Sequence, residues 1–420
     1  MSDKLTVDIR SEIGQLEGVI LHKPGKEVEN MTPENASRAL YDDILNLSVA
    51  SKEYSEFEGV LNKATRTFQL KDLLIDILQD EKIKENLVAK ICQLDAKNDI
   101  QSFVLSQSNE EVARMILEGV EMKKDNLSRF LDNDRYSLEP LPNFFFTRDA
   151  SASWLDKVLI CNMASQVRAR ETLVMEAIFD YHPLIETKSI NPCKRFDTKG
   201  LATIEGGDFL IAREDVLLIG TGPRTSSQGI DSVIEYLKAH KMDMTIIAQQ
   251  LPSKPESFIH LDMVFTFLDK NKCMVYEPLI MNNPRFQTIE IKVQGGKVTS
   301  IREIKNILEG LKPLGIDLEP VFCGGNGDSY FKEREQWQSG ANFFAMAPGK
   351  VIGYGRNIHT IEEMNKHGFE VLSASDIVSE KISMDDYKRF VVTFDGAELS
   401  RGGGGARCMT MPLRRKSVNW

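Results

Sequence analysis

The chain has 420 residues, of which 42% are hydrophobic and 27% charged, a balance typical of a soluble globular protein with one large domain or two to three ordinary ones. Its formal net charge is −10 and it has no basic stripe, which argues against nucleic acid as the main partner and slightly favours a small cationic substrate. No apolar run reaches the length of a membrane span, and the first residues lack a signal-peptide pattern. We therefore expect a cytoplasmic protein that engages neither nucleic acid nor membrane.

The cysteines agree with a reducing compartment. No two of them form a Cys-x-x-Cys pair, and most stand in apolar surroundings typical of buried strand or helix, so neither disulfides nor a cysteine zinc site is expected. The six are Cys92, Cys161, Cys193, Cys273, Cys323 and Cys408.

The first predicted elements are a strand over 18–22, a helix over 51–64 and a strand over 67–70. Residues 1–70 hold only part of a structural unit, which a strand over 408–413 would complete from the other end of the chain. Between residues 71 and 134 apolar residues recur at helical spacing amid many charges, which predicts an all-α insertion. Its apolar stripe is typical of a helix-bundle core rather than of a cofactor site.

Four later segments share one layout of strand, tight polar turn and strand, which is the signature of a β-hairpin. Each is generally followed by a helix and another short strand, as in 170–181, 227–240 and 360–367 for the helices and 244–248 and 369–372 for the strands. The repeated unit is therefore ββαβ. The hairpins span 149–161, 208–219, 262–276 and 342–354.

The starts of these units are separated by 59, 54 and 80 residues, and the longest gap contains an extra hairpin around 294–297. Repeats at this spacing predict a five-fold pseudo-symmetric α/β propeller of ββαβ modules with an all-α helical insertion. The first module would begin in 1–70, the insertion would occupy 71–134, and 135–420 would hold the remaining modules. An open mixed α/β sheet fits the periodicity equally well.

An acid or an amide opens every one of these units: Asp149, Asp208, Asp262 and Asn342. A single Asp before a strand commonly does no more than cap a turn. In a ring, however, equivalent positions converge on the axis, and several carboxylates there would form a pocket for a cation. The recurrence favours this functional interpretation.

Local motifs add proton-transfer groups to the carboxylates. Glu205 and Asp208 flank a glycine pair, so both can lie where the backbone approaches a ligand. His260 and Asp262 are two residues apart and would share one face of a strand. A His-x-Asp pair can also bind a metal, but no second suitably spaced histidine is present, so metal binding is the weaker interpretation.

A possible nucleophile follows four consecutive glycines, 402–405, near the C-terminus. Arg407 precedes Cys408, and an adjacent cation favours thiolate over thiol. A flexible linker with a chance cysteine would have the same appearance. Together with His260 and the acids, however, Cys408 completes a catalytic set. It would be the nucleophile, His260 would transfer protons, and the carboxylates would bind a cation.

With these residues the chain resembles the arginine deiminase family of the guanidino-modifying (pentein) superfamily. The resemblance implies a five-fold α/β propeller with a helical insertion, hydrolysis of L-arginine to L-citrulline and ammonia without cofactor or metal, and a homo-oligomer, either dimer or tetramer. The matching motifs run nearly end to end, at 31–35, 40–43, 143–149, 205–208, 260–262, 334–342 and 407–412.

The resemblance also implies roles for single residues. Cys408 would attack the guanidinium carbon, and His260 would protonate the departing ammonia and then activate water. Asp149 and Asp262 would grip the guanidinium, with Glu205 contributing to that site and orienting His260. Arg168 and Arg224 would hold the substrate carboxylate with help from Asn143, Phe146 and Leu40 would wall the pocket, the backbone of Gly402 would meet the α-amino group, and Asp208 would belong to the substrate-binding set.

Two positions depart from the family pattern. Gly403 stands where many members have an arginine five residues before the cysteine, and Arg407 stands where others have histidine. Either Arg401 or Arg407 could replace the missing contact. A hydrolase of a ureido or modified-guanidino substrate, or an amidinotransferase, is therefore an alternative. A catalytically inactive binding module is disfavoured, because it would not need the nucleophile.

Overall fold

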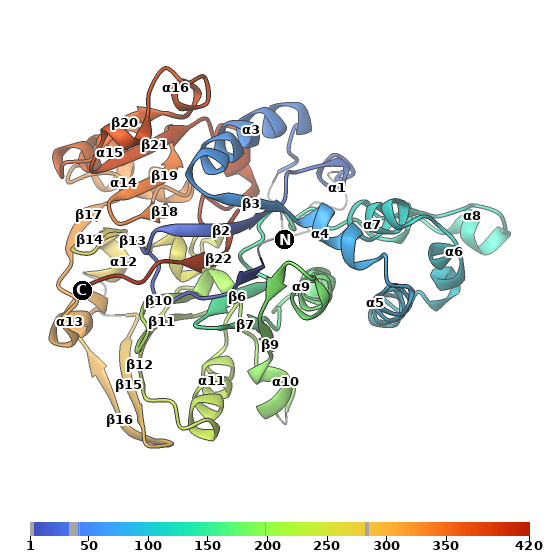
Figure 1. Cartoon of the computed structure of the whole chain (residues 1–420), viewed down its shortest axis with the longest axis horizontal. Coiled ribbons are helices and arrows are strands. Elements are labelled where there is room, and N and C mark those ends of the chain that lie inside the picture. Colours follow the sequence, from blue (N-terminus) through green and yellow to red (C-terminus); the bar gives the residue numbers. More distant parts are fainter. Residues whose placement is uncertain (1–3, 33–40, 42, 198, 282–284) are drawn as a thin grey trace.

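The computed structural model describes residues 4–32, 41, 43–197, 199–281 and 285–420 (Figure 1). Leu40, which was expected to wall the pocket, lies outside the described residues. Helices and strands alternate along most of the chain, and the protein is of the α/β class.

All four predicted hairpins are confirmed as antiparallel pairs. In each, a short polar turn joins two strands whose side chains are almost all buried. The pairs are β6 (Ser151–Trp154) with β7 (Lys157–Ile160), β10 (Phe209–Arg213) with β11 (Val216–Thr221), β13 (Phe265–Asp269) with β14 (Lys272–Val275), and β18 (Phe344–Ala347) with β19 (Lys350–Tyr354).

A third strand lies parallel to the second strand of each hairpin. A parallel pair needs a long crossover, usually helical, and in three units a helix supplies it: α9 (Ala169–Tyr181), α11 (Ser227–Ala239) and α15 (Ile358–Lys366). The third strands are β9 (Lys188–Ile190), β12 (Met244–Gln250), β17 (Glu319–Phe322) and β21 (Phe390–Phe394).

Two sheets extend further. The strand expected over 369–372 is β20 (Glu370–Ser373), but it pairs with β21 at the sheet edge, so β21 rather than β20 contacts β19. The extra hairpin is present as β15 (Thr288–Gln294) and β16 (Lys297–Ile304), and β15 pairs with β12.

The two ends of the chain meet in one sheet, as predicted. β22 (Met411–Arg415) pairs antiparallel with β2 (Leu16–Leu21), and β3 (Arg66–Gln69) pairs parallel with β2 on the other side. Helix α3 (Leu47–Ala64) connects β2 to β3 and begins where the side chain of Asn46 accepts hydrogen bonds from two backbone N–H groups. This sheet therefore has the strand pattern of the other four.

The segment 71–134 is mainly helical and projects from the rest of the molecule (Figure 1). It is not entirely α, because β4 (Val120–Glu121) pairs antiparallel with β5 (Tyr136–Leu138). The helices of this part of the chain are α4 (Leu70–Ile77), α5 (Glu81–Leu94), α6 (Gln101–Leu105), α7 (Asn109–Glu118) and α8 (Leu127–Leu131).

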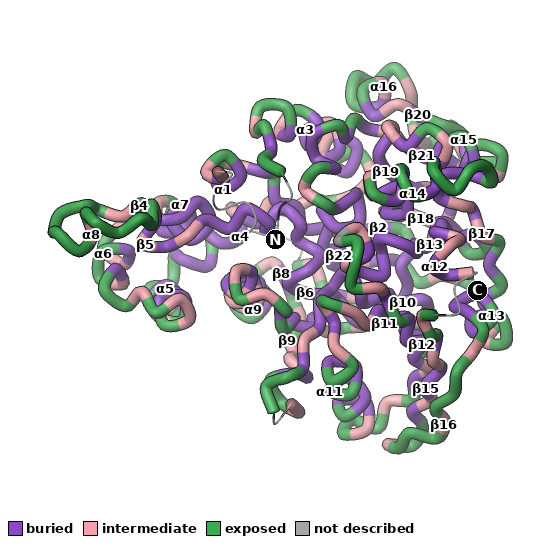
Figure 2. The backbone as a smooth tube through the Cα atoms, turned by 180° about the vertical axis from the view of Figure 1, so that it is seen from behind, coloured by how far each residue is buried: buried purple, intermediate pink, exposed green. Residues whose placement is uncertain are grey.

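The helical segment shares its core with the sheets. Leu74 and Ile116 belong to one buried apolar cluster with Ile20 of β2 and Ile178 of α9. Figure 2 shows the buried backbone concentrated in the strands, whereas the tip around α8 is exposed. Among the described helices, none is both long and apolar enough to cross a membrane.

Short elements complete the structure. They are β1 (Leu5–Thr6), which pairs with β8 (Ile185–Glu186), and the helices α1 (Lys26–Glu29), α10 (Pro192–Phe196), α12 (Glu277–Ile280), α13 (Ile307–Leu311), α14 (Ser329–Trp337) and α16 (Ala374–Val378).

The sheet formed by the two chain ends predicts a large cost for truncating its core side chains. Leu413 in β22 is fully buried, so Leu413→Ala should lower the free energy of unfolding by about 2–5 kcal/mol. Leu131 in α8 is 68% exposed, and Leu131→Ala should change the free energy of unfolding by less than about 0.5 kcal/mol. Chemical denaturation would measure both; equal losses would contradict the assigned burial.

Candidate active site

A cavity of about 290 Å³ lies where the starts of several hairpins meet the C-terminal loop. Eight residues predicted for the site line it: Asn143, Phe146, Asp149, Arg168, Arg224, His260, Gly402 and Cys408. Glu205, Asp208 and Asp262 are not among the lining residues and are fully buried. The lining also includes Tyr41, Asp43, Ser257, Ile259, Met263, Trp337, Ser400, Arg401, Gly403 and Gly404.

His260 and Asp262 do not share one face of a strand, and this expectation was wrong. Residues 261–263 form a turn of 3₁₀ helix, so the two side chains diverge toward different partners. The glycine pair before Asp208 allows the turn that contains these glycines to pack closely against the turn that follows His260. A Cβ at Gly207 would stand 2.4 Å from Nδ1 of His260, so only glycine allows the close approach.

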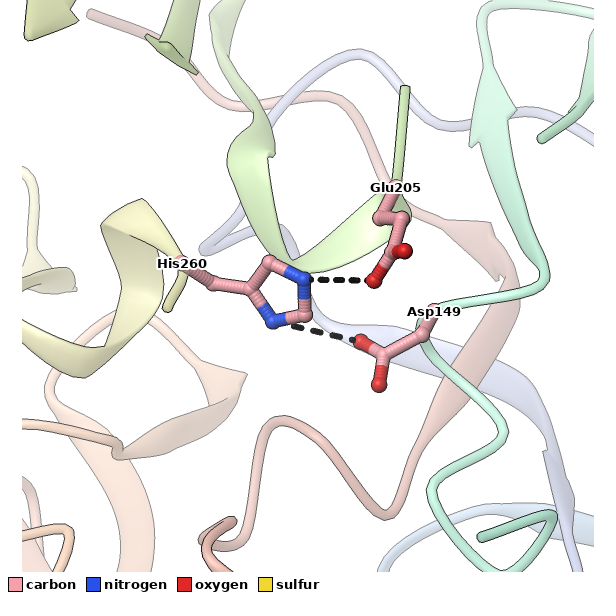
Figure 3. Close-up of side chains that lie close together, drawn as sticks. All are labelled: Asp149, Glu205 and His260. Carbon is pink, nitrogen blue, oxygen red and sulfur yellow. Dashed lines mark hydrogen bonds and ion pairs between the residues drawn. The ribbon is translucent and has the colours of Figure 1, made fainter. Parts of the chain in front are cut away.

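His260 is buried between two carboxylates (Figure 3). Its Nε2 lies 2.9 Å from Oε2 of Glu205, and its Nδ1 lies 3.7 Å from Oδ1 of Asp149. Burial lowers the pKa of His260, but the charges of Asp149, Glu205 and Asp208 and the hydrogen bond with Glu205 outweigh it and raise the pKa to about 9. At neutral pH the ring is an imidazolium whose two N–H groups can both donate.

Glu205 is ionised in spite of its burial. Burial raises its pKa, but the hydrogen bond and charge of His260, followed by the charges of Arg224 and Arg168, lower the pKa to about 2. Its Oε1 accepts a hydrogen bond of 3.0 Å from the backbone N–H of Ala164. The carboxylate therefore fixes one side of the imidazolium.

Cys408 faces Asp262. Its Sγ lies 3.7 Å from Oδ2 of Asp262, and burial, Asp262 and Asp149 together raise the pKa of the thiol well above its ordinary value. Arg407 opposes this shift only weakly, because its guanidinium is bound to Glu12 and Asp262. The expectation that Arg407 makes Cys408 a thiolate is therefore not met by these surroundings alone.

The glycine-rich loop is held firmly against its neighbours. Oδ1 of Asn342 accepts hydrogen bonds from the backbone N–H groups of Arg407 and Cys408, at 2.9 and 3.3 Å, and the Tyr354 hydroxyl donates to the carbonyl of Gly404 at 2.9 Å. A Cβ at Gly404 would lie 2.5 Å from the ring of Phe146. Glycine is thus needed for packing here, and the fourth unit, through Asn342, positions Cys408.

The two arginines predicted for the substrate carboxylate differ in their surroundings. Arg168 is buried, with Nη1 2.6 Å from Oδ2 of Asp149 and with Nε and Nη2 donating to Glu171 at 3.0 and 2.8 Å. Among the described residues, the side chain of Arg224 makes one ion pair, with Glu205 at 3.9 Å. Within the described residues, Arg224 is therefore held by fewer protein contacts than Arg168.

Asp208 is not brought to the cavity, although the sequence suggested a substrate contact. Its Oδ1 accepts a hydrogen bond of 2.8 Å from the backbone N–H of Leu261, so it supports the turn that carries His260. Burial raises its pKa to about 6 against the opposing charge of His260.

Glu12 is a site residue that sequence reasoning missed. It binds Arg407 from almost 400 residues away, and no local motif around residue 12 signals this contact. Trp337, which lines the cavity, lies within the motif 334–342 but was given no role there.

Among the described residues, one group could hold a metal ion: Asp149, Glu205 and His260, whose ligand atoms lie within 4.8 Å of one another. A histidine can bind a metal ion only through an unprotonated ring nitrogen. Because the pKa of His260 is about 9, the imidazolium itself supplies the positive charge between these carboxylates at neutral pH. A metal ion would have to displace this proton, so the high pKa of His260 favours proton transfer over metal binding.

Sequence comparisons give one consistent result. A model of the arginine deiminase family matches residues 37–415. The chain is 36% identical over 434 residues to arginine deiminase from Bacillus cereus (strain ATCC 10987), covering 99% of this chain and 100% of the relative. It is 34% identical to arginine deiminase from Oenococcus oeni, over 100% and 99% of the two chains, and 34% identical to that from Treponema denticola, over 98% and 99%.

Solved structures share the α/β fold at low sequence identity. SxtG, an amidinotransferase from Microseira wollei, is 15% identical with a TM-score of 0.52, covering 98% of both chains. The N-terminal domain of ArgZ, an arginine dihydrolase from cyanobacteria, is 11% identical with a TM-score of 0.52, covering 95% of this chain and 98% of that one. These likenesses concern the fold alone.

The environment of His260 predicts that its imidazole loses its proton only near pH 9. Glu205→Gln removes both a negative charge and a charge-assisted hydrogen bond, so the His260 midpoint should fall by about one pH unit or more. An NMR titration of the protein carrying isotope-labelled histidine would measure this midpoint. Glu362→Gln, which neutralises an exposed carboxylate, is the control and should leave the midpoint unchanged. If the titration midpoint of His260 is the same in Glu205→Gln as in the unchanged protein, the pairing of His260 with Glu205 is refuted.

Proposed function

The chain belongs to the arginine deiminase family, and from this premise we propose that it hydrolyses L-arginine to L-citrulline and ammonia through a covalent intermediate on Cys408. The observation that carries the proposal is the cavity in which a thiol, an imidazolium and the Asp149 carboxylate face one space. Such a set suits a cationic planar group that is attacked by sulfur and protonated by the ring.

The guanidinium of the substrate would bind between Asp149 and Asp262. Carboxylate–guanidinium pairs are strong and geometrically selective because two N–H groups can donate in parallel. Oδ1 of Asp149 is buried, lies 3.7 Å from Nδ1 of His260 and accepts no hydrogen bond among the described residues, so its acceptor capacity is unused. Oδ1 of Asp262 faces Cys408 at 4.0 Å, and the carboxylate thus places the guanidinium carbon near the sulfur.

Arrival of the cation activates the thiol. Asp149 and Asp262 raise the pKa of Cys408, and a bound guanidinium neutralises part of that field, so the thiol releases its proton to solvent as substrate binds. The thiolate then forms a bond with the guanidinium carbon. Restricting the thiolate to the occupied site also protects the cysteine from other electrophiles.

His260 carries the proton in both halves of the reaction. The imidazolium donates its proton to the departing nitrogen, the C–N bond breaks, ammonia leaves, and an amidino-thioether on Cys408 remains. The neutral imidazole then takes a proton from water as the water oxygen attacks the same carbon. Cleavage of the C–S bond releases citrulline and the Cys408 thiolate, the second proton of the water passes to solvent, where it protonates the released ammonia, and His260 is again an imidazolium.

The far end of the substrate would be held by Arg224 and Arg168, with Asn143 assisting. Phe146 would wall the pocket and the backbone of Gly402 would meet the α-amino group. Arg168 also holds Asp149, so it would orient one guanidinium contact while it approaches the carboxylate. Leu40 would also wall the pocket; this role rests only on the resemblance to the family.

We also propose that the five similar sheets form a five-fold propeller around this cavity. In its support, Figure 1 shows β2, β6, β10, β13 and β18 toward the middle and α3, α9, α11 and α15 toward the outside. The corresponding division is a first module begun in 1–70, the helical insertion 71–134 and the remaining modules in 135–420.

A cytoplasmic location and a homo-oligomer complete the proposal. All six cysteines are free and buried, which suits a reducing compartment. The dimer or tetramer rests on the family resemblance, and light scattering of the purified protein would test it.

The proposed chemistry predicts that purified protein with L-arginine alone yields citrulline and ammonia in equal amounts. Cys408→Ala should lower this turnover by more than about a thousandfold, because the covalent route is lost. Cys92→Ala, which changes another buried cysteine, should retain it. Turnover of citrulline instead of arginine, or turnover only with an acceptor amine, would show that the alternative substrate or the amidinotransferase is correct.

The proposed carboxylate contact predicts that Arg224→Ala raises KM for arginine by about tenfold or more, with a smaller effect on kcat. The matched control is Arg213→Ala, because Arg213 is also partly buried but does not line the cavity. Steady-state kinetics on both variants would measure the difference. An unchanged KM in Arg224→Ala would remove Arg224 from the substrate site.

A further inference from the structure

In three units an arginine lies between the second strand of the hairpin and the helix that follows. Arg168 and Arg224 occupy this position in the first two hairpin units, and both line the active-site cavity. Arg356 occupies it between β19 and α15, in the unit that begins at Asn342, and it does not line the cavity. Its guanidinium instead contacts the segment that leads to Cys408.

Three acceptors in the segment 396–400 surround one nitrogen of Arg356. Its Nη1 lies 3.1 Å from the carbonyl oxygen of Gly396, 2.9 Å from that of Ala397 and 2.5 Å from Oγ of Ser400. A charged donor forms stronger hydrogen bonds than a neutral one. The guanidinium therefore holds two successive carbonyl groups and a hydroxyl at the start of the glycine-rich loop.

Glu53 in α3 holds the same segment by its N–H groups. Its buried carboxylate accepts hydrogen bonds from the backbone of Glu398 at 3.0 Å and of Leu399 at 2.9 Å. Helix α3 packs against β21 beside this point (Figure 1). Because Arg356 binds carbonyl groups and Glu53 binds N–H groups, residues 396–399 are fixed from two neighbouring units.

The anchored segment leads directly into the wall of the active-site cavity. It enters the 3₁₀ turn η8 (Leu399–Gly402), and residues 400–404 line the cavity. The other end of the glycine run has a separate attachment, because Asn342 accepts from the backbone N–H groups of Arg407 and Cys408. The loop is therefore held independently at its start, beside the cavity wall, and at Cys408.

We propose that Arg356 and Glu53 are positioning residues for substrate binding. They fix the start of the loop so that the backbone of Gly402 meets the α-amino group of the substrate, while Asn342 keeps Cys408 in place. This inference rests on the proposed function and deepens it. Loss of the first attachment should weaken substrate binding without slowing the reaction of bound substrate, a separation that a general loss of structure would not produce.

Steady-state kinetics with arginine test this separation. Arg356→Ala should raise KM about tenfold and change kcat by less than about twofold. Arg356→Lys should keep KM within about threefold of the unchanged protein, because an ammonium group also has three donors. Glu53→Gln, which retains an acceptor oxygen, should raise KM less than Glu53→Ala. The control Arg302→Ala removes an arginine that binds Glu290 instead and should change neither constant.

Hydrogen exchange, measured by mass spectrometry without substrate, separates this inference from the proposed function. In Arg356→Ala the amides of 399–404 should exchange at least about tenfold faster, whereas those of α11 should not change. This result together with no turnover of arginine by the unchanged protein would support the anchoring and overturn the proposed function.

The inference itself is overturned by any of three results in Arg356→Ala. These are an unchanged KM, a fall in kcat as large as the rise in KM, and exchange in 399–404 that is unchanged or is accelerated equally in α11. Each would show that the loop is positioned without Arg356 or that the variant is damaged as a whole.

Discussion

The site depends on one buried cation, the guanidinium of Arg407. It donates to both carboxylate oxygens of Glu12 at 3.0 Å and to Oδ2 of Asp262 at 2.9 Å, with 1% of the residue exposed. Three distant parts of the chain are thereby joined: the N-terminal segment, the start of the third hairpin and the loop that ends in the nucleophile. Burial raises the pKa of Glu12, but Arg407 overcomes it and lowers the pKa to about 2. Because removal of either partner would leave a buried charge uncompensated, neither end of this ion pair can vary independently.

The same arrangement gives the cavity its charge. Arg407 donates to Oδ2 of Asp262, and both oxygens of that carboxylate lie near Sγ of Cys408, at 3.7 and 4.0 Å. Arg168 donates to Oδ2 of Asp149 and leaves Oδ1 without a hydrogen bond among the described residues. Each structural arginine thus orients a carboxylate beside the cavity and leaves one of its oxygens without an arginine contact. Asp149 and Asp262 disfavour the thiolate of Cys408, so a cationic ligand placed beside these carboxylates would be stabilised by the same charges that keep the thiol protonated. Selectivity for a cationic substrate and control of thiol reactivity therefore have one electrostatic origin.

Local patterns predicted the hairpins, the long helices and the sheet made from both chain ends, because short apolar runs, helical spacing and turn chemistry are properties of short segments. The repeated layout also predicted that Asp149 and His260 would lie together, because equivalent starts of the repeated units lie near one another. Cys408 joins them from the C-terminal segment that completes the first unit. Local patterns failed where tertiary contacts decide the outcome. The turn after His260 is 3₁₀ helix rather than strand, Asp208 supports Leu261 instead of lining the cavity, and the contact between Glu12 and Arg407 has no counterpart in nearby sequence.

The glycine at 403 is the remaining departure from the family pattern, and the structure limits what can compensate for it. A Cβ there would meet open space, although φ of +82° would strain any other residue, so an arginine at this position would project freely. Arg407 cannot supply the missing contact, because its donors are bound to Glu12, Asp262 and the carbonyl of Phe209. Arg401 lines the cavity but is held by Glu398 at 3.1 Å and by Asp43. In the proposed binding mode, the far end of the substrate would therefore rely on Arg224, with Arg168 beside it. A cavity that lacks one cation would then accept a less acidic distal group more readily than a cavity that has it.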